Sequence, residues 1–476
     1  MNNKVGTMTE PITISDSLAI RIRDELDQNV YLCYQCVKCT SGCPVAEFFD
    51  WQPNQIMRAV QLGQEDIAMG SQTPWLCAAC QTCTTRCPQN LDIAAIMEFL
   101  TREAIARGIE PVVPNVNNFN KAFLREVRLW GRAYEPGLMV EMILHDPKAM
   151  LGDLDIYMGM LKKRKVGFLP NPVRMPSSRV IEPIAGASKA VAYYPGCSLE
   201  TTAAEYNIST KAVCKALDLD LIEPRGWVCC GSSAAHRADP EAALQLPMEN
   251  LALIEQSGFG EVTMPCAACF NRHKAAQHKI RHHNGHKARV DKALGYSFQD
   301  TVHVNTLIET IIKHIGPERV ANKVTNPLDN LRVVCYYGCL LTRPPEVTEA
   351  EHPENPTDMD VLIAALGAEV RDWSYKTTCC GAAHALTRPD IVLQLSGNII
   401  KHARKTGADI IAVACPLCHM NLDVRQIQME IDEPMPILYF TQLMALAFGL
   451  PKKAAGLHKN MIYPRPLLQR KRILSG

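Results

Sequence analysis

One cysteine pattern occurs twice in the chain, and this repeat constrains the fold more than any other feature. Each copy has the form C…CCG…CxxC and contains five cysteines. The copies are Cys197, Cys229, Cys230, Cys266 and Cys269, and then Cys339, Cys379, Cys380, Cys415 and Cys418. Flanking stretches match as well, since VAYYPGC in the first copy corresponds to VVCYYGC in the second. We therefore predict a duplicated unit of about 140 to 150 residues, called a CCG unit below.

Short β-rich runs alternate with helical patterns within each CCG unit, which indicates parallel α/β layers. The predicted strands cover residues 190–195, 219–222 and 261–264, and then 331–337, 368–373 and 409–414. Helices are predicted to begin at Asp239-Pro240 and Arg388-Pro389, and Gly407 is expected just beyond a helix end. Open α/β sheets bind ligands at strand ends, where these cysteines lie. We expect the two units to pack face to face, with their metal sites near the seam.

The adjacent cysteines of each copy require a turn. Neighbouring side chains on a strand point to opposite faces, so Cys229-Cys230 and Cys379-Cys380 can serve one metal centre only where the chain turns. Gly231 and Gly381 provide the backbone freedom for that turn. Five thiolates are one too many for tetrahedral zinc or an ordinary four-cysteine cubane, which favours a less regular cluster.

A second pattern, C-x2-C-x2-C-x3-C-P, also occurs twice, nearer the N-terminus. In two-cluster ferredoxins the fourth cysteine of each run ligates the other cluster. We therefore assign Cys33, Cys36, Cys39 and Cys87 to one [4Fe–4S] cluster, and Cys77, Cys80, Cys83 and Cys43 to a second. Structural zinc is the alternative, but it favours two separated C-x2-C pairs over one dense run. These eight thiols are expected to carry electrons.

The predicted fold class is α + α/β. Helical patterns without a convincing strand surround the two dense runs, over residues 12–28, 54–64, 93–108 and 118–134. We predict a helical ferredoxin-like domain with two [4Fe–4S] clusters at 1–165, a proline-rich linker at 166–190, and two duplicated α/β CCG units at 191–330 and 331–476, the second with a C-terminal tail. The remaining cysteines, Cys214 and Cys335, are expected to pack in a helix and a strand.

Composition and motifs exclude several classes of protein. Lys plus Arg number 50 and Asp plus Glu 49, which is not the balance of a nucleic-acid binder. The basic stretch Arg272–Lys287 is predicted to be a solvated helix end or loop, with a docking patch for an acidic partner as the alternative. The run Ile437–Leu450 is too short to span a membrane and is expected to form a buried helix.

The N-terminal stretch shows no signal-peptide pattern, so we expect a cytoplasmic protein, peripheral on a membrane only through a partner. Since the chain has no flavin, nicotinamide or nucleotide motif, we expect a partner to exchange electrons with it.

The spacings C-x31-C-C-x35-C-x2-C and C-x39-C-C-x34-C-x2-C resemble the paired CCG motifs of the heterodisulfide reductase B-type subunit. The preceding region, from YLCYQCVKCTSGCPV to about LKKRKVGFLP, resembles the C-type subunit. The chain is therefore similar to a C–B fusion, the arrangement of the D-type subunit, over nearly its full length.

This resemblance implies an oxidoreductase acting on sulfur groups. Each five-cysteine set is then expected to hold a non-cubane [4Fe–4S] cluster, beside the two cubane clusters of the dense runs. A disulfide is split between the two non-cubane clusters, each binding one sulfur, and two electrons and two protons release two thiols; the reverse oxidation is the same chemistry. His236 and His384, in matching AAH contexts after the CCG motifs, are candidate proton donors or, alternatively, packing residues. The implied partner is an A-type flavoprotein or a membrane cytochrome b.

A second function stays open. CCG motifs also occur in iron–sulfur subunits of glycolate oxidase, glycerol-3-phosphate dehydrogenase and some fumarate reductases. There the partner performs the organic chemistry and electrons pass to or from quinone. The two complete CCG sets favour the disulfide reductase.

Overall fold

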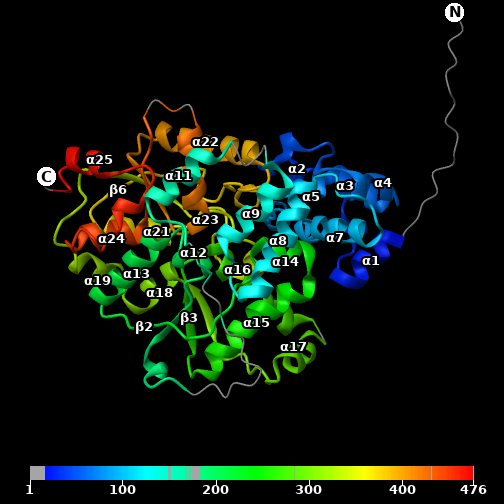
Figure 1. The fold of residues 1–476 in the computed structure, drawn as a ribbon, viewed down its shortest axis with the longest axis horizontal. Coiled ribbons are helices and arrows are strands. Elements are labelled where there is room, and N and C mark those ends of the chain that lie inside the picture. The colour runs from blue at the N-terminus through cyan, green and yellow to red at the C-terminus, as the bar shows by residue number, and fades with distance from the viewer. Residues whose placement is uncertain are drawn as a thin grey trace, which may run out of the picture. The chain divides into compact units, whose positions relative to one another are not determined.

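The computed structural model describes residues 17–147, 152–167, 169–170, 173, 183–283, 285–429, 431 and 433–474 (Figure 1). The chain forms two compact bodies. The N-terminal body extends to Cys77 and continues over Thr82–Val113, and the C-terminal body consists of Ala78–Gln81 and residues 114 onward. About half of the predicted linker, residues 168, 171–172 and 174–182, lies outside the described residues.

The described residues of the N-terminal body form helices and no strand. Its α-helices are α1 (Ser17–Leu26), α2 (Lys38–Ser41), α3 (Pro53–Gln61), α4 (Glu65–Gly70), α5 (Thr73–Leu76), α6 (Thr82–Thr85) and α7 (Ile93–Ala106), with short 3₁₀ turns at Val30–Leu32 and Ala46–Phe48. The long helix α7 begins at an N-cap, where the Asp92 carboxylate accepts a hydrogen bond from the backbone N–H of Ala95 at 3.0 Å.

The two dense cysteine runs share an unusual backbone. Gln35 and Val37 in the first run have positive φ values of 61° and 65°. Ala79 and Gln81, at the same places in the second run, have values of 49° and 60°. Non-glycine residues seldom adopt this left-handed conformation, and they are enriched at functional sites. The same pair of left-handed residues therefore recurs between the cysteines of both runs.

The C-terminal body contains two parallel sheets with the same strand order. The first, β2-β1-β3-β4, consists of β1 (Val191–Tyr193), β2 (Leu221–Ile222), β3 (Glu261–Met264) and β4 (His303–Thr306). The second, β6-β5-β7-β8, consists of β5 (Arg332–Tyr336), β6 (Glu369–Val370), β7 (Ile410–Val413) and β8 (Ile437–Tyr439). Every paired strand in both sheets is parallel. The predicted strand runs are confirmed, whereas β4 and β8 were not predicted.

Helices alternate with these strands and share one core. In the first CCG unit they are α12 (Cys197–Glu200), α13 (Ala204–Ala216), α14 (Ser232–Ala238), α15 (Pro240–Gln256), α16 (Ala267–His282), α17 (His286–Leu294), α18 (Leu307–His314) and α19 (Pro317–Asn322). In the second they are α20 (Pro345–Thr348), α21 (Asp358–Ala365), α22 (Pro389–Lys405), α23 (Pro416–His419), α24 (Phe440–Ala447) and α25 (Arg465–Arg470). A continuous hydrophobic core joins the two units, so they form one packed structure.

Both predicted helix starts are confirmed, at Pro240 and Pro389. Gly407, with a φ of 75°, follows the end of α22 as expected. The two other cysteines pack as expected, since Cys214 lies in α13 and is 1% exposed, and Cys335 lies in β5 and is fully buried.

Three helices that precede the CCG units pack with the C-terminal body. They are α8 (Pro114–Trp130), α9 (Glu135–His145) and α11 (Leu154–Lys162). The sequence placed them in the first domain, up to residue 165, but the compact bodies divide at Val113–Pro114. The physical reason is packing, because α8 contacts both α9 and α14.

The apolar run Ile437–Leu450 corrects one prediction. Only its middle forms a buried helix, α24, because its first three residues form β8 at the edge of the second sheet. The period of the hydrophobic pattern alone does not separate a short buried strand from a buried helix.

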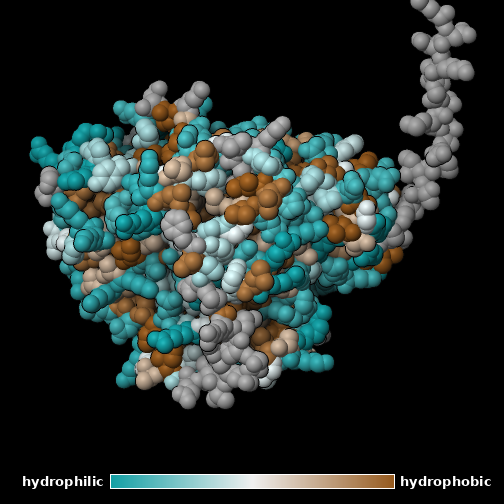
Figure 2. All heavy atoms as spheres, viewed as in Figure 1, coloured by the Kyte–Doolittle hydropathy of each residue, from teal (hydrophilic) through white to brown (hydrophobic). Residues whose placement is uncertain are grey.

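Within the described parts of the chain, no helix combines the length and the apolar character that crossing a membrane requires. Figure 2 shows apolar residues scattered over a mainly hydrophilic face.

Candidate iron–sulfur site

Loops after adjacent parallel strands position the first set of thiols. Cys197 follows β1 and Cys266 follows β3, its neighbour in the sheet. The chain leaves β1 for β2 on one side and returns to β3 on the other, so the ends of β1 and β3 form a topological switch point. Such points create the crevice in which open α/β sheets bind ligands. The second sheet repeats this arrangement, with Cys339 after β5 and Cys415 after β7.

Hydrogen bonds connect all five thiols of the first set. Cys229 contacts Cys197 and Cys230, and these contacts together with burial raise the pKa of Cys229. Cys230 in turn lies 3.5 Å from Cys269, Sγ to Sγ. Cys266 completes the set through its contact with Cys269.

The second set is similar, and one contact joins it to the first. Cys339 contacts Cys379, and the Sγ atoms of Cys380 and Cys418 are 3.6 Å apart. Cys415 contacts both Cys418 and, from the other CCG unit, Cys266. The predicted meeting of the sets at a seam therefore has a direct structural counterpart in the Cys266–Cys415 contact.

Glycines make room for the sulfurs. A Cβ atom at Gly196 would lie 2.8 Å from Cys269 Sγ, and one at Gly338 would lie 2.9 Å from Cys418 Sγ. Both glycines also have positive φ, 73° and 74°, so any other residue would be strained there. Each glycine thus allows the backbone to approach a ligand sulfur more closely than a side chain permits.

The vicinal cysteines lie at the expected turns. Gly231 and Gly381 both have a φ of 80°, directly after Cys229-Cys230 and Cys379-Cys380. The two turns are held alike, because the Tyr194 hydroxyl donates to the Val228 carbonyl at 2.7 Å and the Tyr336 hydroxyl donates to the Thr378 carbonyl at 2.6 Å.

All ten cysteines of the two sets line one cavity of about 240 Å³, which we call the thiol cavity. The rest of its wall is largely apolar and includes Phe119, Phe123, Leu138, Leu340 and Leu386. Two charged side chains, Glu135 and Arg272, also line it. A second cavity of about 180 Å³ shares Glu135, Leu138, Ser198 and other wall residues with the thiol cavity.

The donor set fits iron–sulfur clusters in type and in grouping. Soft thiolates are the ligands that such clusters take from proteins, and here they come in fives with glycine-made space beside the sulfurs. Five soft thiols in each set exceed the four ligands of tetrahedral zinc and suit an iron–sulfur group in number and type.

In the dense runs, the structure brings two cysteine-bearing helices together. Helices α2 and α6, which carry Cys39 and Cys83, pack against each other within the N-terminal body. Burial, followed by the charges of Cys33 and Cys36, raises the pKa of Cys39 to about 11 although Thr40 lowers it. Because a thiolate is the ligand form, metal binding must supply the energy to deprotonate this buried group.

Cys80 belongs to the short segment Ala78–Gln81, which groups with the C-terminal body. Its side chain hydrogen-bonds with Cys379 of the second CCG set. A cysteine of the second dense run is therefore in contact with a cysteine that lines the thiol cavity.

The two candidate histidines lie near the CCG turns but not in the thiol cavity. His236 is on α14, and His384 is in the 3₁₀ turn Ala382–His384 and is fully buried. His384 Nδ1 lies 3.5 Å from Thr387 Oγ1. Neither histidine is among the described residues that line the cavity, so proton delivery by them stays a prediction.

Sequence reasoning missed Glu135 and predicted Arg272 in a solvated helix end or loop, whereas the structure buries Arg272 within α16. The carboxylate Oε1 of Glu135 accepts a hydrogen bond from Thr202 at 2.9 Å, while its Oε2 is buried without a partner. Arg272 is 3% exposed, and its Nε is also buried without a partner. Glu135 lies in a helix far from the cysteine motifs along the chain, and no sequence pattern marks it as a site residue. Arg272 lies three residues after Cys269, and this closeness to a CxxC motif could have marked it.

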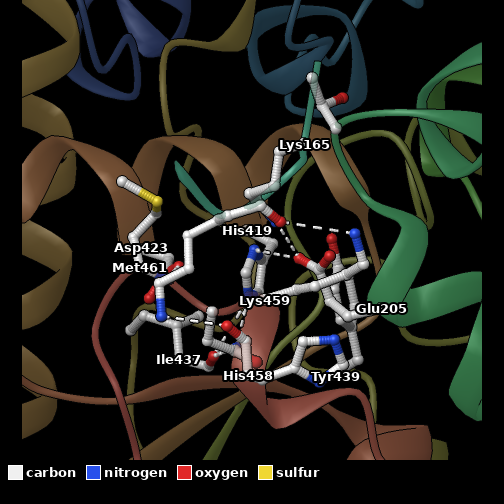
Figure 3. A network of polar contacts seen from close by, with 12 residues as sticks. Lys165, Glu205, His419, Asp423, Ile437, Tyr439, His458, Lys459 and Met461 are labelled. Atoms are coloured by element: carbon white, nitrogen blue, oxygen red, sulfur yellow. Dashed lines mark hydrogen bonds and ion pairs between the residues drawn. The ribbon is translucent and has the colours of Figure 1, made fainter. Parts of the chain in front are cut away.

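A buried charged network supports the CxxC turn of the second unit (Figure 3). Lys165 and Glu205 form a fully buried ion pair, and His419 Nδ1 lies 3.9 Å from the same carboxylate. Burial lowers the pKa of His419, so this histidine is neutral and stacks on Tyr439 with ring centroids 4.3 Å apart. Burial also raises the pKa of Asp423 to about 7, and its carboxyl oxygens accept hydrogen bonds from the backbone of Met461 and Ile462. The network ties α13, the second CxxC turn and the C-terminal tail together.

Comparisons with known proteins agree with this site. A cysteine-rich (CCG) domain model matches residues 191–272 and 333–423, and a 4Fe-4S dicluster domain model matches 32–92. The B-type subunit of the ferredoxin/F420H2-dependent CoB-CoM heterodisulfide reductase of Methanosarcina acetivorans is 28% identical, over 56% of this chain and 92% of that protein. The C-type subunit of the ferredoxin:CoB-CoM heterodisulfide reductase of the same organism is 34% identical over 20% of this chain and 39% of its own length.

This chain belongs to the heterodisulfide reductase family. It joins a region similar to the C-type subunit to a region similar to the B-type subunit, as the resemblance to the D-type fusion predicted. It is thus an iron–sulfur protein whose relatives are subunits of multi-subunit oxidoreductases.

Another family relative has a different name. The 8-methylmenaquinol:fumarate reductase membrane anchor subunit of Wolinella succinogenes is 34% identical, over 58% of this chain and 97% of that protein. The chain is therefore similar both to proteins named for disulfide reactions and to one named for a quinol reaction.

Proposed function

We propose that this chain is the catalytic subunit of a heterodisulfide reductase-like complex, which reduces a disulfide to two thiols or runs the reverse oxidation. One observation carries the proposal: both five-thiol sets line the same cavity. A disulfide held there has one sulfur facing each set, which is the arrangement that splitting one S–S bond between two metal centres requires.

The proposed ligands are those of the sequence analysis. Each CCG set holds a non-cubane [4Fe–4S] cluster. The two units are both needed because each of the two sulfur atoms of the disulfide binds at one cluster. When bound, these clusters supply the two electrons and an iron with room for a new sulfur ligand. The proposed order is the helical ferredoxin-like region followed by the paired CCG units, and the helices after Val113 pack with the CCG units.

The protein's own residues shape the reaction volume. Apolar side chains such as Phe123 and Leu386 exclude water around the thiols, which strengthens every charge interaction inside. The guanidinium of Arg272 lies in this wall and favours negative charge on product sulfurs or on the substrate's substituent.

Electrons are proposed to arrive through the two dense runs. The Cys80–Cys379 contact supports this route, because it brings a ligand of the second run to the second CCG set. The electron donor is proposed to be an A-type flavoprotein or a membrane cytochrome b, with the chain cytoplasmic and peripheral on the membrane through that partner.

The relative from Wolinella succinogenes supports a second candidate function. In this alternative the chain passes electrons between a partner enzyme and quinone and has no disulfide substrate. The same cavity would then receive no disulfide, and the ten thiols would serve electron transfer alone.

Oxidation of reduced viologen by the anaerobically purified chain separates the two functions. The panel contains disulfides, coenzyme M–coenzyme B among them, and quinone analogues. Turnover with a disulfide supports the first function. Turnover with quinones and none with any disulfide would establish the second instead.

A further inference from the structure

We propose that Glu135 is the acid that delivers protons to the product sulfurs in the thiol cavity. This inference rests on the proposed disulfide reduction. That reaction consumes two protons, and the polar residues of the described cavity wall besides Glu135 are the cysteines, three serines, Tyr194 and Arg272. The Tyr194 hydroxyl donates to the Val228 carbonyl, and burial raises its pKa well above the usual range. Arginine stays charged in proteins and gives up no proton. Glu135 is the remaining acid among the described wall residues.

The position of Glu135 suits a proton carrier. The residue begins α9 and lines both the thiol cavity and the second cavity. Thr202 donates to Oε1 at 2.9 Å and fixes the carboxyl group, whereas the buried Oε2 receives no hydrogen bond from the described residues. An orphaned buried oxygen carries an energetic cost unless it is protonated or meets a ligand or water.

The environment brings the titration of this carboxyl to near neutral pH. Burial raises the pKa of Glu135 to about 7, against the lowering effect of Thr202, Thr201 and Lys165. The other charged or titratable groups that face it across the second cavity are Asp153, Tyr157 and Arg425, and Asp153 and Arg425 neutralise each other in an ion pair. A carboxyl with this pKa can give a proton to a thiolate and regain one from water at the same pH.

The chemistry balances with an external one-electron donor. The S–S bond breaks as two electrons enter, and two thiolates form. Glu135 transfers its proton to one sulfur, is reprotonated from water through the second cavity, and transfers another proton to the second sulfur. The sum is R–S–S–R′ plus two electrons and two protons, giving R–SH and R′–SH.

The test compares Glu135→Gln with the matched control Glu126→Gln. Glu126, on α8, is also a buried carboxyl whose pKa burial raises, but it lines neither cavity.

In the wild-type protein, viologen-linked disulfide reduction should fall as pH rises through about 7, because the acid form of Glu135 is lost. Glu135→Gln should lower kcat at least about ten-fold at neutral pH and remove this alkaline fall, with KM and iron content unchanged. Glu135→Asp should restore part of kcat, and Glu126→Gln should keep the wild-type profile.

A spectroscopic readout avoids dependence on activity. The infrared difference spectrum of wild-type protein minus Glu135→Gln should contain the carbonyl band of a protonated carboxyl, and this band should disappear between pH 6 and pH 8 (about one unit on either side of the pKa). The band of Asp423, whose pKa burial also raises to about 7, is common to both proteins and cancels in the difference. A wild-type protein that reduces disulfides, with an unchanged pH profile and carboxyl band in Glu135→Gln, would overturn the inference. A wild-type protein that reduces no disulfide would refute the proposed function instead.

Discussion

The two CCG units have the same framework but different walls. Both have the strand order second-first-third-fourth, a positive-φ glycine beside a cysteine sulfur, and a tyrosine hydroxyl that holds the vicinal turn. After the CxxC motif they diverge. The first unit continues into the sixteen-residue helix α16, whereas α23 ends after four residues and passes into a π-helix over Met420–Val424.

This difference decides what each unit offers to a substrate. Three residues after the CxxC motif, α16 places Arg272 in the thiol cavity, while the π-helix has Asn421 at the corresponding place. Asn421 donates to the Cys380 carbonyl at 3.0 Å and lines the second cavity with Met420 and Val424. Single-turn π-helices occur frequently at functional sites. Two similar frames can therefore hold the two proposed clusters and still present different side chains to the proposed disulfide.

The largest expected effect concerns the shared need for both units. Cys230→Ala and Cys380→Ala should each abolish disulfide reduction almost completely, because neither sulfur can be received alone. The double variant should be hardly worse than either single one, as expected for groups that act as a unit. Initial rates of viologen oxidation measure this. Roughly multiplicative losses would mean that the units work independently.

The matched glycines should show equal effects. Gly196→Ala and Gly338→Ala each place a Cβ within 3 Å of a ligand sulfur on a positive-φ backbone. Each should cost about four of about sixteen irons per chain, one cluster of four. Iron analysis of anaerobically purified protein gives the count. Gly260→Ala is the control, because nothing lies within 4 Å of its Cβ position. Full iron content in both variants would show that the space beside the sulfur is not needed.

Removing one partner of the buried ion pair should destabilise the second unit's CxxC turn. Glu205→Gln or Lys165→Met leaves a buried charge unpaired, which should lower the free energy of unfolding by about 3–5 kcal/mol. Denaturant unfolding of the cluster-loaded protein measures it. The double variant should recover much of the loss, and Lys211→Met, which breaks an exposed pair with Glu223, should change stability by less than about 1 kcal/mol. Equal effects of Lys165→Met and Lys211→Met would contradict the role of burial.

Sequence patterns predicted the parts of this site that local chemistry determines. Cysteine spacing gave the two kinds of set, and the glycine after each vicinal pair indicated the turn that a φ of 80° now shows. The segment that forms β8 was predicted as helix. It is a strand because it pairs with β7, and this tertiary pairing is not visible in the local sequence pattern. Glu135 was missed since only folding brings α9 to cysteines more than sixty residues away, as the shared cavity wall shows.

A cysteine variant in a dense run should lose electron transfer, whereas a cysteine variant in a CCG unit should lose thiol binding. Cys83→Ser should slow electron entry from a partner or dye while leaving thiol binding at the CCG sets intact. Stopped-flow reduction and thiol-induced spectral changes measure the two properties separately. Loss of thiol binding as complete as in Cys380→Ser would remove the division into electron path and active site.

The smallest expected effect concerns Arg272 and Asn421, which occupy corresponding places in the two CCG units. Arg272→Met should raise KM for disulfides with an anionic substituent by about ten-fold, one charge-assisted hydrogen bond, and should affect neutral disulfides less. Asn421→Ala should not distinguish the two substrate classes. The measurement is the ratio of kcat/KM for a matched anionic disulfide to kcat/KM for a neutral one. An unchanged ratio in Arg272→Met would show that the first unit does not distinguish substrates by charge.

The central claim is that one disulfide meets both CCG sets, and a selenium-labelled substrate tests it most directly. A diselenide analogue is added to the reduced protein, and the selenium X-ray absorption edge reports the neighbours of each selenium atom. We expect both selenium atoms to have an iron neighbour, and one of them to lose it in Cys230→Ala and the other in Cys380→Ala. Iron beside only one selenium, or beside neither, in the intact protein would contradict the account.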